Sequence, residues 1–406
     1  MLEFDDGHRN MASKWTNIEF LRTKLKDPTI KNCTLESMKG AGGNSGVMNR
    51  LMVTYNNGLT TTYILKVNSE HTERAAALGL PREALFYDQF APKIQNIVPR
   101  TLYSEGDMKA GTKAIVLEDL SVLDRDGCDY VQMGLYFTAH SPLNWEKTEK
   151  GEMDSLMLSG NKIEELMRKA FECGADLHAT YWNDAALAQD KDLDWLRGHD
   201  WYRGEGKDTW QASQSVVHNI WKSGTMSISE WNSKFVSLLE ASIAKVNWDD
   251  FQNRIHNTAF TLVHGDFHPA NFMVARKKDS DNVIFGDVKL MDWEVVGIGC
   301  GPQDMGQFVI SHVPPETRRR LEKQVFREAY YDKLVEKLKA KNVEKLPTFE
   351  ECWHEYVYGG VERWVWLLVI CNNIFPKPAG DYFYNQVKDF ANDHGVNIET
   401  IGMPRA

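Results

Sequence analysis

The sequence predicts an α+β protein of two lobes, with a β-rich N-terminal part and a mostly helical C-terminal part. Three observations support this class. Strand-like composition dominates residues 34–67, helical periodicity begins at residue 161 and continues through most of the remaining chain, and a short β interlude at 259–293 interrupts the helices. We see no internal repeat and no low-complexity segment.

In the N-terminal part, a hairpin is the clearest element. Leu51, Val53 and Tyr55 alternate with less apolar residues and lead into Asn56-Asn57-Gly58, a strong turn signal between two strands. The second strand, TTTYILKV, is rich in β-branched residues. Pro81 then occupies the favoured first position of a predicted helix, PREALFYDQFAPKI.

The boundary between the lobes is predicted after residue 120. Residues 113–120 have the composition of a buried strand followed by a turn, whereas residues 121–160 show no clean periodicity and predict a connector. We therefore expect an N-terminal lobe over 1–120 and a C-terminal lobe over 121–406 that contains the hairpin 259–293. Helices in this lobe are predicted over 161–181, 208–222 and 229–248, and again from about 302.

Composition and charge restrict the function. The formal net charge is -10, which argues against a nucleic-acid-binding surface and is compatible with a neutral or cationic substrate. The first residues, MLEFDDGHRN, contain no apolar stretch, and the longest strongly apolar run is far shorter than the roughly 20 residues needed to span a bilayer. Six cysteines form no C-x-x-C pair. We therefore expect a cytoplasmic protein without a membrane or nucleic-acid partner.

The segment LVHGDFHPAN carries the strongest chemical signal. An apolar strand leads into a loop that contains Asp266, and Asn271 follows in the frame H-x-D-x-x-x-x-N. Protein kinases use this frame for a catalytic Asp that accepts the substrate hydroxyl proton and an Asn that binds Mg²⁺. Downstream, Asp292 ends the apolar strand of VKLMDWE, where a carboxylate can complete a magnesium site. Asp266 is thus the candidate base, and Asn271 and Asp292 are the candidate metal ligands.

Two further features fit a nucleotide-binding function. Lys66 lies near the end of an apolar strand, and Glu83 in the first turn of the next helix can pair with it and direct the ammonium group toward phosphates. The preceding segment, KGAGGNSGVMN, is rich in glycine, and Ser45 adds a hydroxyl to its backbone N–H groups. This segment does not match the Walker pattern G-x-x-x-x-G-K-[ST].

Together these residues predict a kinase that phosphorylates a small molecule. Three other functions are weighed against this hypothesis. His264, Asp266 and His268 form an H-x-D-x-H cluster that predicts a metal-dependent hydrolase active without ATP. A kinase-shaped binding protein without catalysis is a second alternative. A protein kinase is disfavoured, because only a short segment separates Asp292 from the next predicted helix and no A-P-E element follows.

HGDFHPAN followed by LMDWE resembles the motif pair of the aminoglycoside phosphotransferase and choline kinase superfamily, and the chain is most similar to its ecdysteroid-kinase-like branch. ADLHATYW, GPQDMGQF and SHVPPETRRR add to a resemblance that spans roughly residues 35–375. It implies a protein-kinase-like fold that uses ATP and Mg²⁺ to phosphorylate a hydroxyl group on a small molecule.

The resemblance also implies roles for individual residues. Asp266 would be the base, Asn271 and Asp292 the magnesium ligands, and Lys66 with Glu83 the phosphate clamp. The strand from Val116 to Leu120, which includes Glu118, would supply the hinge backbone that meets adenine. The nucleotide-binding loop around Ser45 departs from the family pattern by an extra residue or two. Acceptors in this superfamily include antibiotics, choline, amino alcohols, sugars and steroids, so a cationic acceptor is one candidate class.

Overall fold

A computed structural model describes residues 14–38, 47–68, 72–122, 128–137, 141–142, 144–150, 160–224, 226, 228–279 and 282–406. The chain divides into two compact units by internal contacts. The first, called the β unit, comprises Met1–Val131 and Ala275–Val296, and the second, called the helical unit, comprises Gln132–Val274 and Gly297–Ala406. The division predicted after residue 120 stays a prediction.

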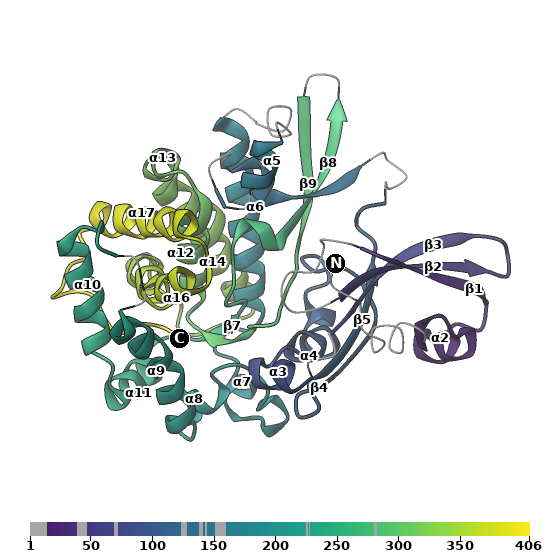
Figure 1. The fold of residues 1–406 in the computed structure, drawn as a ribbon, viewed down its shortest axis with the longest axis horizontal. Coiled ribbons are helices and arrows are strands. Elements are labelled where there is room, and N and C mark those ends of the chain that lie inside the picture. The colour runs from purple at the N-terminus through teal and green to yellow at the C-terminus, as the bar shows by residue number, and fades with distance from the viewer. Residues whose placement is uncertain are drawn as a thin grey trace. The chain divides into compact units, whose positions relative to one another are not determined.

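A five-stranded sheet is the framework of the β unit, and its strands follow the order β1-β2-β3-β5-β4 with antiparallel neighbours (Figure 1). The strands are β1 (Ile30–Ser37), β2 (Val47–Tyr55), β3 (Thr60–Val67), β4 (Thr101–Asp107) and β5 (Thr112–Glu118). The predicted hairpin is confirmed: the chain turns between β2 and β3 at Gly58, whose φ of 82° suits glycine. Neither β1 in full nor β4 was predicted.

Helices cover parts of this sheet and fix its core. They are α2 (Ile18–Leu25), α3 (Thr72–Leu78), α4 (Arg82–Gln89) and the 3₁₀ turn η1 (Ala91–Lys93). The predicted helix is α4, with Pro81 at its N-cap, and it contacts β4 and β5. Leu21, Leu51 and Leu65 are completely buried in the core on which α2 packs. This arrangement places the first turn of α4 close to β3 and β5.

The β interlude is longer and more complex than predicted. A three-stranded sheet has the order β6-β8-β9, formed by β6 (Asp129–Gln132), β8 (Phe272–Asp279) and β9 (Asn282–Leu290). Residues 276–279 of the polar segment RKKDSDN, which was predicted as a loop, belong to β8. Arg276 in this strand donates from Nε to Asp129 Oδ1 at 2.9 Å. Two shorter strands, β7 (Thr261–Val263) and β10 (Gly297–Gly299), pair antiparallel in the helical unit.

The helical unit contains the remaining elements. Its α-helices are α5 (Trp145–Glu149), α6 (Gly160–Thr180), α7 (Ala185–Gln189), α8 (His199–Arg203), α9 (Lys207–Ser223), α10 (Ser233–Ala244), α11 (Trp248–Asn257), α12 (Gly301–His312), α13 (Pro315–Val325), α14 (Asp332–Ala340), α15 (Phe349–His354), α16 (Gly360–Ile374) and α17 (Lys377–Asp393). The 3₁₀ turns are η2 (Met133–Tyr136), η3 (Lys191–Leu193) and η4 (Pro269–Asn271), and η5 (Phe326–Tyr331) and η6 (Glu355–Gly359) are π-helical.

Helix α12 is the centre of this unit. All of its residues are buried, and it contacts α6, α16 and α17 (Figure 1). A close approach between glycines makes this packing tight: a Cβ on Gly306 would lie 2.3 Å from the Tyr356 carbonyl oxygen and 2.9 Å from Gly360 Cα. Because α12 begins shortly after β10 and contacts β7, it is in position to support the loop that follows β7.

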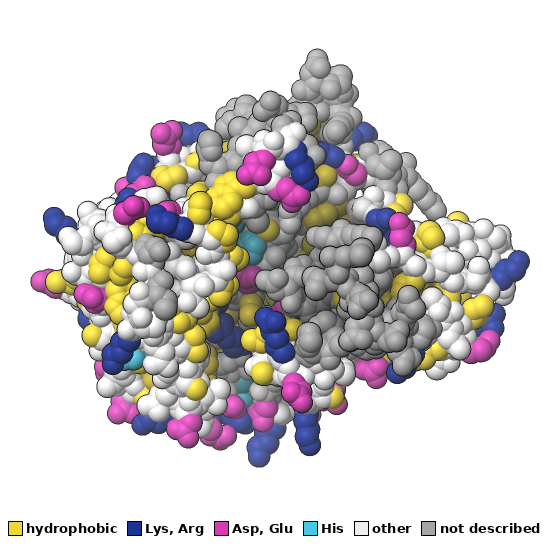
Figure 2. All heavy atoms as spheres, in the orientation of Figure 1, with side chains coloured by type: hydrophobic (Ala, Val, Ile, Leu, Met, Phe, Trp, Pro, Cys, Tyr) yellow, Lys and Arg dark blue, Asp and Glu magenta, His cyan; other side chains and the backbone are white. Residues whose placement is uncertain are grey.

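The α+β class, with a β-rich N-terminal region and a mostly helical C-terminal region, is confirmed. Among the described residues, every helix is too short or too polar to cross a membrane. On the face drawn in Figure 2, acidic and basic side chains are interspersed and do not separate into regions of one sign.

Candidate functional site

The β unit contains a buried cluster of charged side chains around Lys66. Lys66 Nζ lies 2.8 Å from Glu83 Oε2 and 3.0 Å from Glu83 Oε1, so the pairing expected from the sequence is present. The side chains of Lys66 and Glu83 are 9% and 2% exposed. Strand β3 supplies the lysine and the first turn of α4 supplies the carboxylate. A buried charge requires a partner of opposite charge, and Lys66 and Glu83 are partners of this kind for each other.

Asp292 reaches the same ammonium group. Lys66 Nζ lies 3.0 Å from Asp292 Oδ1, and the Asp292 side chain remains 43% exposed. The Asp292 backbone has a φ of 66°, a left-handed conformation that is uncommon for a residue other than glycine and is frequent at functional sites. The next residue holds it there: Trp293 is fully buried and stacks on Phe86 with ring centroids 3.7 Å apart. Asp292 is thus anchored by Trp293 while its carboxylate stays accessible.

Sequence reasoning missed Lys113 and did not predict that Glu294 belongs to this cluster. Lys113 on β5 has a fully buried side chain, and its Nζ lies 2.7 Å from Glu83 Oε2 and 2.5 Å from Glu294 Oε1. Glu294 also lies 3.4 Å from Lys66 Nζ. A sequence signal for Lys113 existed, because it is the single charged residue inside the otherwise apolar run of TKAIVL.

The cluster favours the ionised forms of Glu83 and Lys66. Burial alone would raise the pKa of Glu83, but Lys113 and Lys66 outweigh this effect and lower it to about 2. Burial alone would lower the pKa of Lys66, but Glu83, Asp292 and Glu294 raise it well above its ordinary value. Lys66 and Glu83 are therefore both charged at neutral pH.

The predicted hinge residues lie at the end of β5. The Glu118 N–H donates to the Arg100 carbonyl at 2.9 Å, and Glu118 Oε1 accepts from the Arg100 N–H at 2.8 Å. Glu118 is therefore part of the sheet. Leu120 lies just beyond it, and its backbone N–H and C=O have no hydrogen-bond partner among the described residues. Ser45 belongs to residues 39–46, which lie outside the described part of the chain.

In the helical unit, Asp266 and Asn271 form the predicted loop. Asn271 Nδ2 donates to the Asp266 carbonyl oxygen at 2.8 Å and to Asp266 Oδ2 at 3.2 Å, while Gln307 Nε2 lies 3.4 Å from Asp266 Oδ1. Asn271 uses its amide nitrogen for these bonds, which leaves its oxygen as the atom available to a metal. Gln307 was not predicted from the sequence, because its contact with Asp266 depends on how α12 packs.

The ionised form of Asp266 is favoured by its surroundings. Loss of hydration would raise the pKa of Asp266, but His268, His264 and Arg363 lower it below the ordinary value for aspartate. His268 Nε2 lies 3.4 Å from Asp266 Oδ2. The Asp266 side chain nevertheless remains 42% exposed and accessible to a substrate.

Asp304 and Arg363 hold the backbone of this loop. Asp304 is fully buried at the start of α12, where Oδ2 accepts from the His264 N–H at 2.9 Å and Oδ1 from the Gly265 N–H at 3.3 Å. Arg363 Nη2 donates to the Gly265 carbonyl at 3.0 Å. Gly265 has a φ of 78°, which explains a glycine between His264 and Asp266. Asp304 therefore holds the backbone of the loop that contains Asp266.

The geometry does not favour the hydrolase alternative. His264 Nδ1 accepts from the Asp266 N–H at 3.2 Å and His268 Nδ1 from the Ala270 N–H at 3.3 Å, so both rings order the loop. Within the described residues, two groups of three side chains are spaced to hold one metal ion, and neither contains Asp266.

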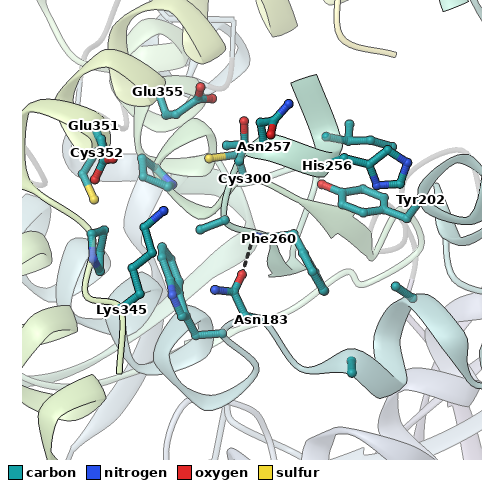
Figure 3. A pocket seen from close by; sticks show the side chains of 18 of the residues that line it. Asn183, Tyr202, His256, Asn257, Phe260, Cys300, Lys345, Glu351, Cys352 and Glu355 are labelled. Atoms are coloured by element: carbon teal, nitrogen blue, oxygen red, sulfur yellow. Dashed lines mark hydrogen bonds between the residues drawn. The ribbon is translucent and has the colours of Figure 1, made fainter. Parts of the chain in front are cut away.

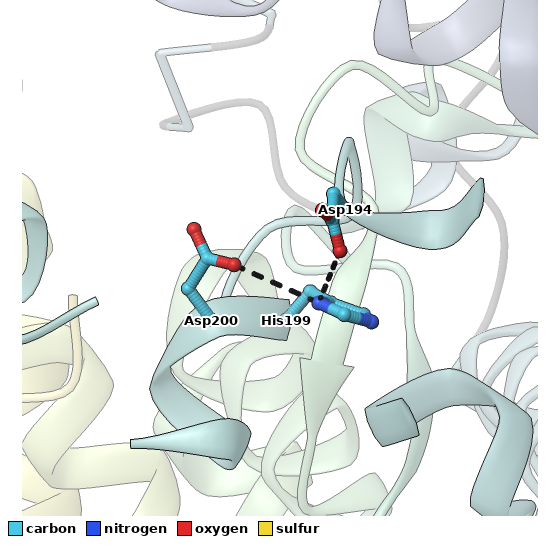
Figure 4. A group of neighbouring side chains, drawn as sticks. All are labelled: Asp194, His199 and Asp200. Atoms are coloured by element: carbon cyan, nitrogen blue, oxygen red, sulfur yellow. Dashed lines mark ion pairs between the residues drawn. The ribbon is translucent and has the colours of Figure 1, made fainter. Parts of the chain in front are cut away.

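One of these two groups is Glu83, Asp292 and Glu294 in the β unit, where two lysines already neutralise the carboxylates. The other lies at α8 and consists of Asp194, His199 and Asp200 (Figure 4). In the second group Arg203 Nη2 lies 3.2 Å from Asp194 Oδ1 and 3.1 Å from Asp200 Oδ1. A cationic side chain therefore occupies each group.

A cavity of about 1140 Å³ lies in the helical unit at the start of β7. Aromatic side chains, including Trp182, Tyr202 and Phe260, line it together with Lys345 and Glu355 (Figure 3). Phe260 precedes β7, whereas the Asp266 loop follows it. The cavity and the Asp266 loop therefore lie at opposite ends of the strand.

The structure thus brings the predicted residues together in two groups. Lys66, Glu83 and Asp292 meet in the β unit, and Asp266 and Asn271 meet in the helical unit. The convergence of Asp266, Asn271 and Asp292 on one nucleotide stays a prediction.

Comparison with known proteins agrees with the family resemblance. Residues 205–343 match the model of the ecdysteroid kinase-like family, and this segment contains Asp266, Asn271, Asp292 and Asp304. The matched segment includes both motifs, HGDFHPAN and LMDWE, on which the resemblance rests. No curated protein matches the chain at a significant level.

Several solved structures are similar to the chain. They include the amicoumacin kinase hAmiN in complex with AMP-PNP, Ca²⁺ and Ami, with 13% identity and a TM-score of 0.45 over 96% of this chain and 97% of that one. The macrolide 2′-phosphotransferase MphH from Brachybacterium faecium has 13% identity and a TM-score of 0.37 over 87% and 92%. A Plasmodium vivax ethanolamine kinase has 10% identity and a TM-score of 0.41 over 98% and 96%. These likenesses are distant, so each substrate remains a statement about that protein.

Proposed function

We propose that this chain, whose residues 205–343 match the ecdysteroid kinase-like family, is an ATP- and Mg²⁺-dependent phosphotransferase that acts on a hydroxyl group of a small molecule. One observation carries the proposal. The buried Lys66 ammonium touches both Glu83, on the following helix, and Asp292, after a distant strand. Kinases join a strand lysine, a helix glutamate and a metal-binding aspartate in this way to hold a nucleotide.

The chemistry of the proposed ligands suits a Mg²⁺ ion. The Asp292 carboxylate in the β unit is 43% exposed and would supply one oxygen ligand, and the Asn271 amide oxygen in the helical unit would supply another. Hard oxygen ligands of this kind suit magnesium, which takes one or two protein ligands and completes its shell with phosphates and water. When bound, the ion would supply neutralisation of the charge that develops on the transferred group.

Asp266 would act on the acceptor. Its low pKa keeps it ionised at neutral pH, and Asn271 and Gln307 fix the orientation of its two carboxylate oxygens. In this role Asp266 accepts a hydrogen bond from the acceptor hydroxyl, orients its oxygen and takes the proton as the new bond forms. Lys66 would hold the donor phosphates, with Glu83 fixing the lysine.

The acceptor is a small hydroxylated molecule in this proposal. Asp292 and the start of α12 at Gly301 are close in sequence, which leaves no room for a long segment that would lay out a peptide substrate. A cationic or neutral acceptor accords with the net charge of -10.

The test is a screen of hydroxylated metabolites for ADP release with ATP and Mg²⁺, run in parallel with direct measurement of ATP binding. We expect ATP binding and turnover with at least one acceptor. Binding without turnover for any acceptor class would favour the non-catalytic alternative. Absence of nucleotide binding, or ATP-independent hydrolysis abolished by chelation, would contradict the proposal.

A further inference from the structure

Lys113 bridges two carboxylates inside the β unit. Its side chain is fully buried, and its Nζ lies within hydrogen-bond distance of Glu83 Oε2 and Glu294 Oε1 at 2.7 and 2.5 Å. Lys66 contacts the same two carboxylates, at 2.8 and 3.4 Å. The two lysines therefore compete for one pair of acids.

The backbone directs Lys113 into this position. Its N–H donates to Asn68 Oδ1 at 3.0 Å, and Asn68 Nδ2 donates to the Gly111 carbonyl at 2.6 Å. The backbone of Glu294 is held separately, because Arg82 Nη1 donates to its carbonyl at 2.8 Å. Both side chains of the ion pair therefore extend from backbone that is held by a further hydrogen bond.

The charges in the cluster indicate how Lys113 affects Lys66. Without Lys113, Glu83 and Glu294 would have only Lys66 as a common cation at this end of the cluster. A carboxylate that loses its partner in a buried site attracts the remaining cation strongly. Lys66 would then be drawn toward these two acids and away from a ligand.

We propose that Lys113 is a positioning residue that neutralises Glu83 and Glu294 and thereby leaves the Lys66 ammonium able to bind the phosphates of a nucleotide. This inference rests on the proposed function, because it assumes that Lys66 is the phosphate-binding lysine. In this proposal Lys113 and Glu294 do not contact the nucleotide. They change its affinity together, through their effect on Lys66.

The experiment measures ADP affinity by calorimetry in EDTA, so that metal ligation makes no contribution. Lys113→Met should weaken ADP binding by roughly tenfold or more, which is the scale of one lost charge-assisted contact. In steady-state kinetics with Mg²⁺, KM for ATP should rise more than kcat falls, since the defect lies in binding. Lys109→Met is the matched control, because Lys109 is exposed in the same unit.

Charge balance provides the decisive comparison. Lys113→Met/Glu294→Gln removes one charge of each sign, and we expect it to recover most of the lost ADP affinity. Glu294→Gln alone should bind ADP at least as tightly as the wild type, because one competitor for Lys66 is gone. This single variant tests the inference even where Lys113→Met fails to fold, since Glu294 is partly exposed.

The outcomes separate the two proposals. If the wild type binds no adenine nucleotide, the proposed function fails. If the wild type binds ADP but folded Lys113→Met binds equally well, or the double variant binds no better than Lys113→Met, the role of Lys113 is wrong. Weaker ADP binding by Glu294→Gln in EDTA would also overturn it.

Discussion

Lys66 and Asp292 are separated by 226 positions in the sequence, and Lys66 Nζ donates to Asp292 Oδ1 at 3.0 Å. The contact joins the end of a sheet strand to a residue held in a left-handed conformation after β9. Because the same carboxylate is the candidate metal ligand, the lysine and a metal ion would share or exchange it. The proposed nucleotide site is therefore coupled to the proposed metal site through this pair.

Asp292→Asn should separate metal binding from nucleotide binding. The variant loses the negative ligand, so the increase in ATP affinity that Mg²⁺ produces should fall by roughly tenfold or more, on the scale of one charged contact. Affinity measured in EDTA should stay close to that of the wild type. Magnesium titration of ATP affinity makes the measurement, and exposed Asp88→Asn is the control. An unchanged magnesium response would remove Asp292 as a ligand.

Asp266→Asn should lower turnover and preserve binding. The amide keeps the size of the side chain but cannot accept a proton, so kcat should fall by about 10²- to 10⁴-fold, the usual contribution of a general base. ATP affinity should change little, because the proposed phosphate contacts belong to Lys66. Single-turnover kinetics and calorimetry measure the two effects, and Asp208→Asn, at an exposed position of α9, is the control. Turnover equal to that of the wild type would exclude Asp266 as the base.

Asp304→Asn should show that the Asp266 loop depends on the hydrogen bonds from Asp304. In the wild type, the His264 and Gly265 N–H groups donate to the two carboxylate oxygens of Asp304. The asparagine of the variant has one oxygen acceptor for these two N–H groups. We expect a loss of about 1–3 kcal/mol in the free energy of unfolding, the cost of an unsatisfied buried donor. Urea denaturation measures this loss, and kcat of the folded enzyme should fall as the loop loosens. A variant with normal stability and normal kcat would show that the tether is dispensable.

His312 should make stability depend on pH. Burial lowers the pKa of His312 well below its ordinary value, and His268 lowers it further, although Asp266 opposes this. The unfolded chain therefore binds a proton below about pH 6.5 that the folded chain does not, so His312 supports stability above that pH and this support is lost as the pH falls. The slope attributable to this residue reaches at most about 1.4 kcal/mol per pH unit.

The test compares His312→Gln with the wild type by urea unfolding between pH 5 and 8. We expect the variant to lose less stability on acidification, even if it is less stable at pH 8 because the contact with Ser141 Oγ at 2.5 Å is removed. Exposed His218→Gln should keep the wild-type slope. Parallel pH profiles for all three proteins would contradict the prediction.

Local sequence pattern predicted the elements that depend on neighbours in the chain. The turn at Asn56-Asn57-Gly58 and the helix after Pro81 follow from turn chemistry and helical spacing, and both are present. Strand β4 escaped prediction because its residues are only partly buried and include Gly106 and Asp107, which are poor strand formers. Its place at the sheet edge comes from pairing with β5, which is not a local property.

The sequence by itself determined which residues are candidates for the chemistry: Asp266, Asn271 and Asp292 stand in a frame whose spacing is typical of phosphoryl transfer. Only the tertiary structure decided which side chains complete it. Lys113 and Glu294 join Lys66 and Glu83 because strand pairing and the anchored Trp293 bring them together. Residues that are far apart in the chain produce no periodic pattern in the sequence when they pair. Their interaction depends on their distance in space and on the low-dielectric interior that folding creates.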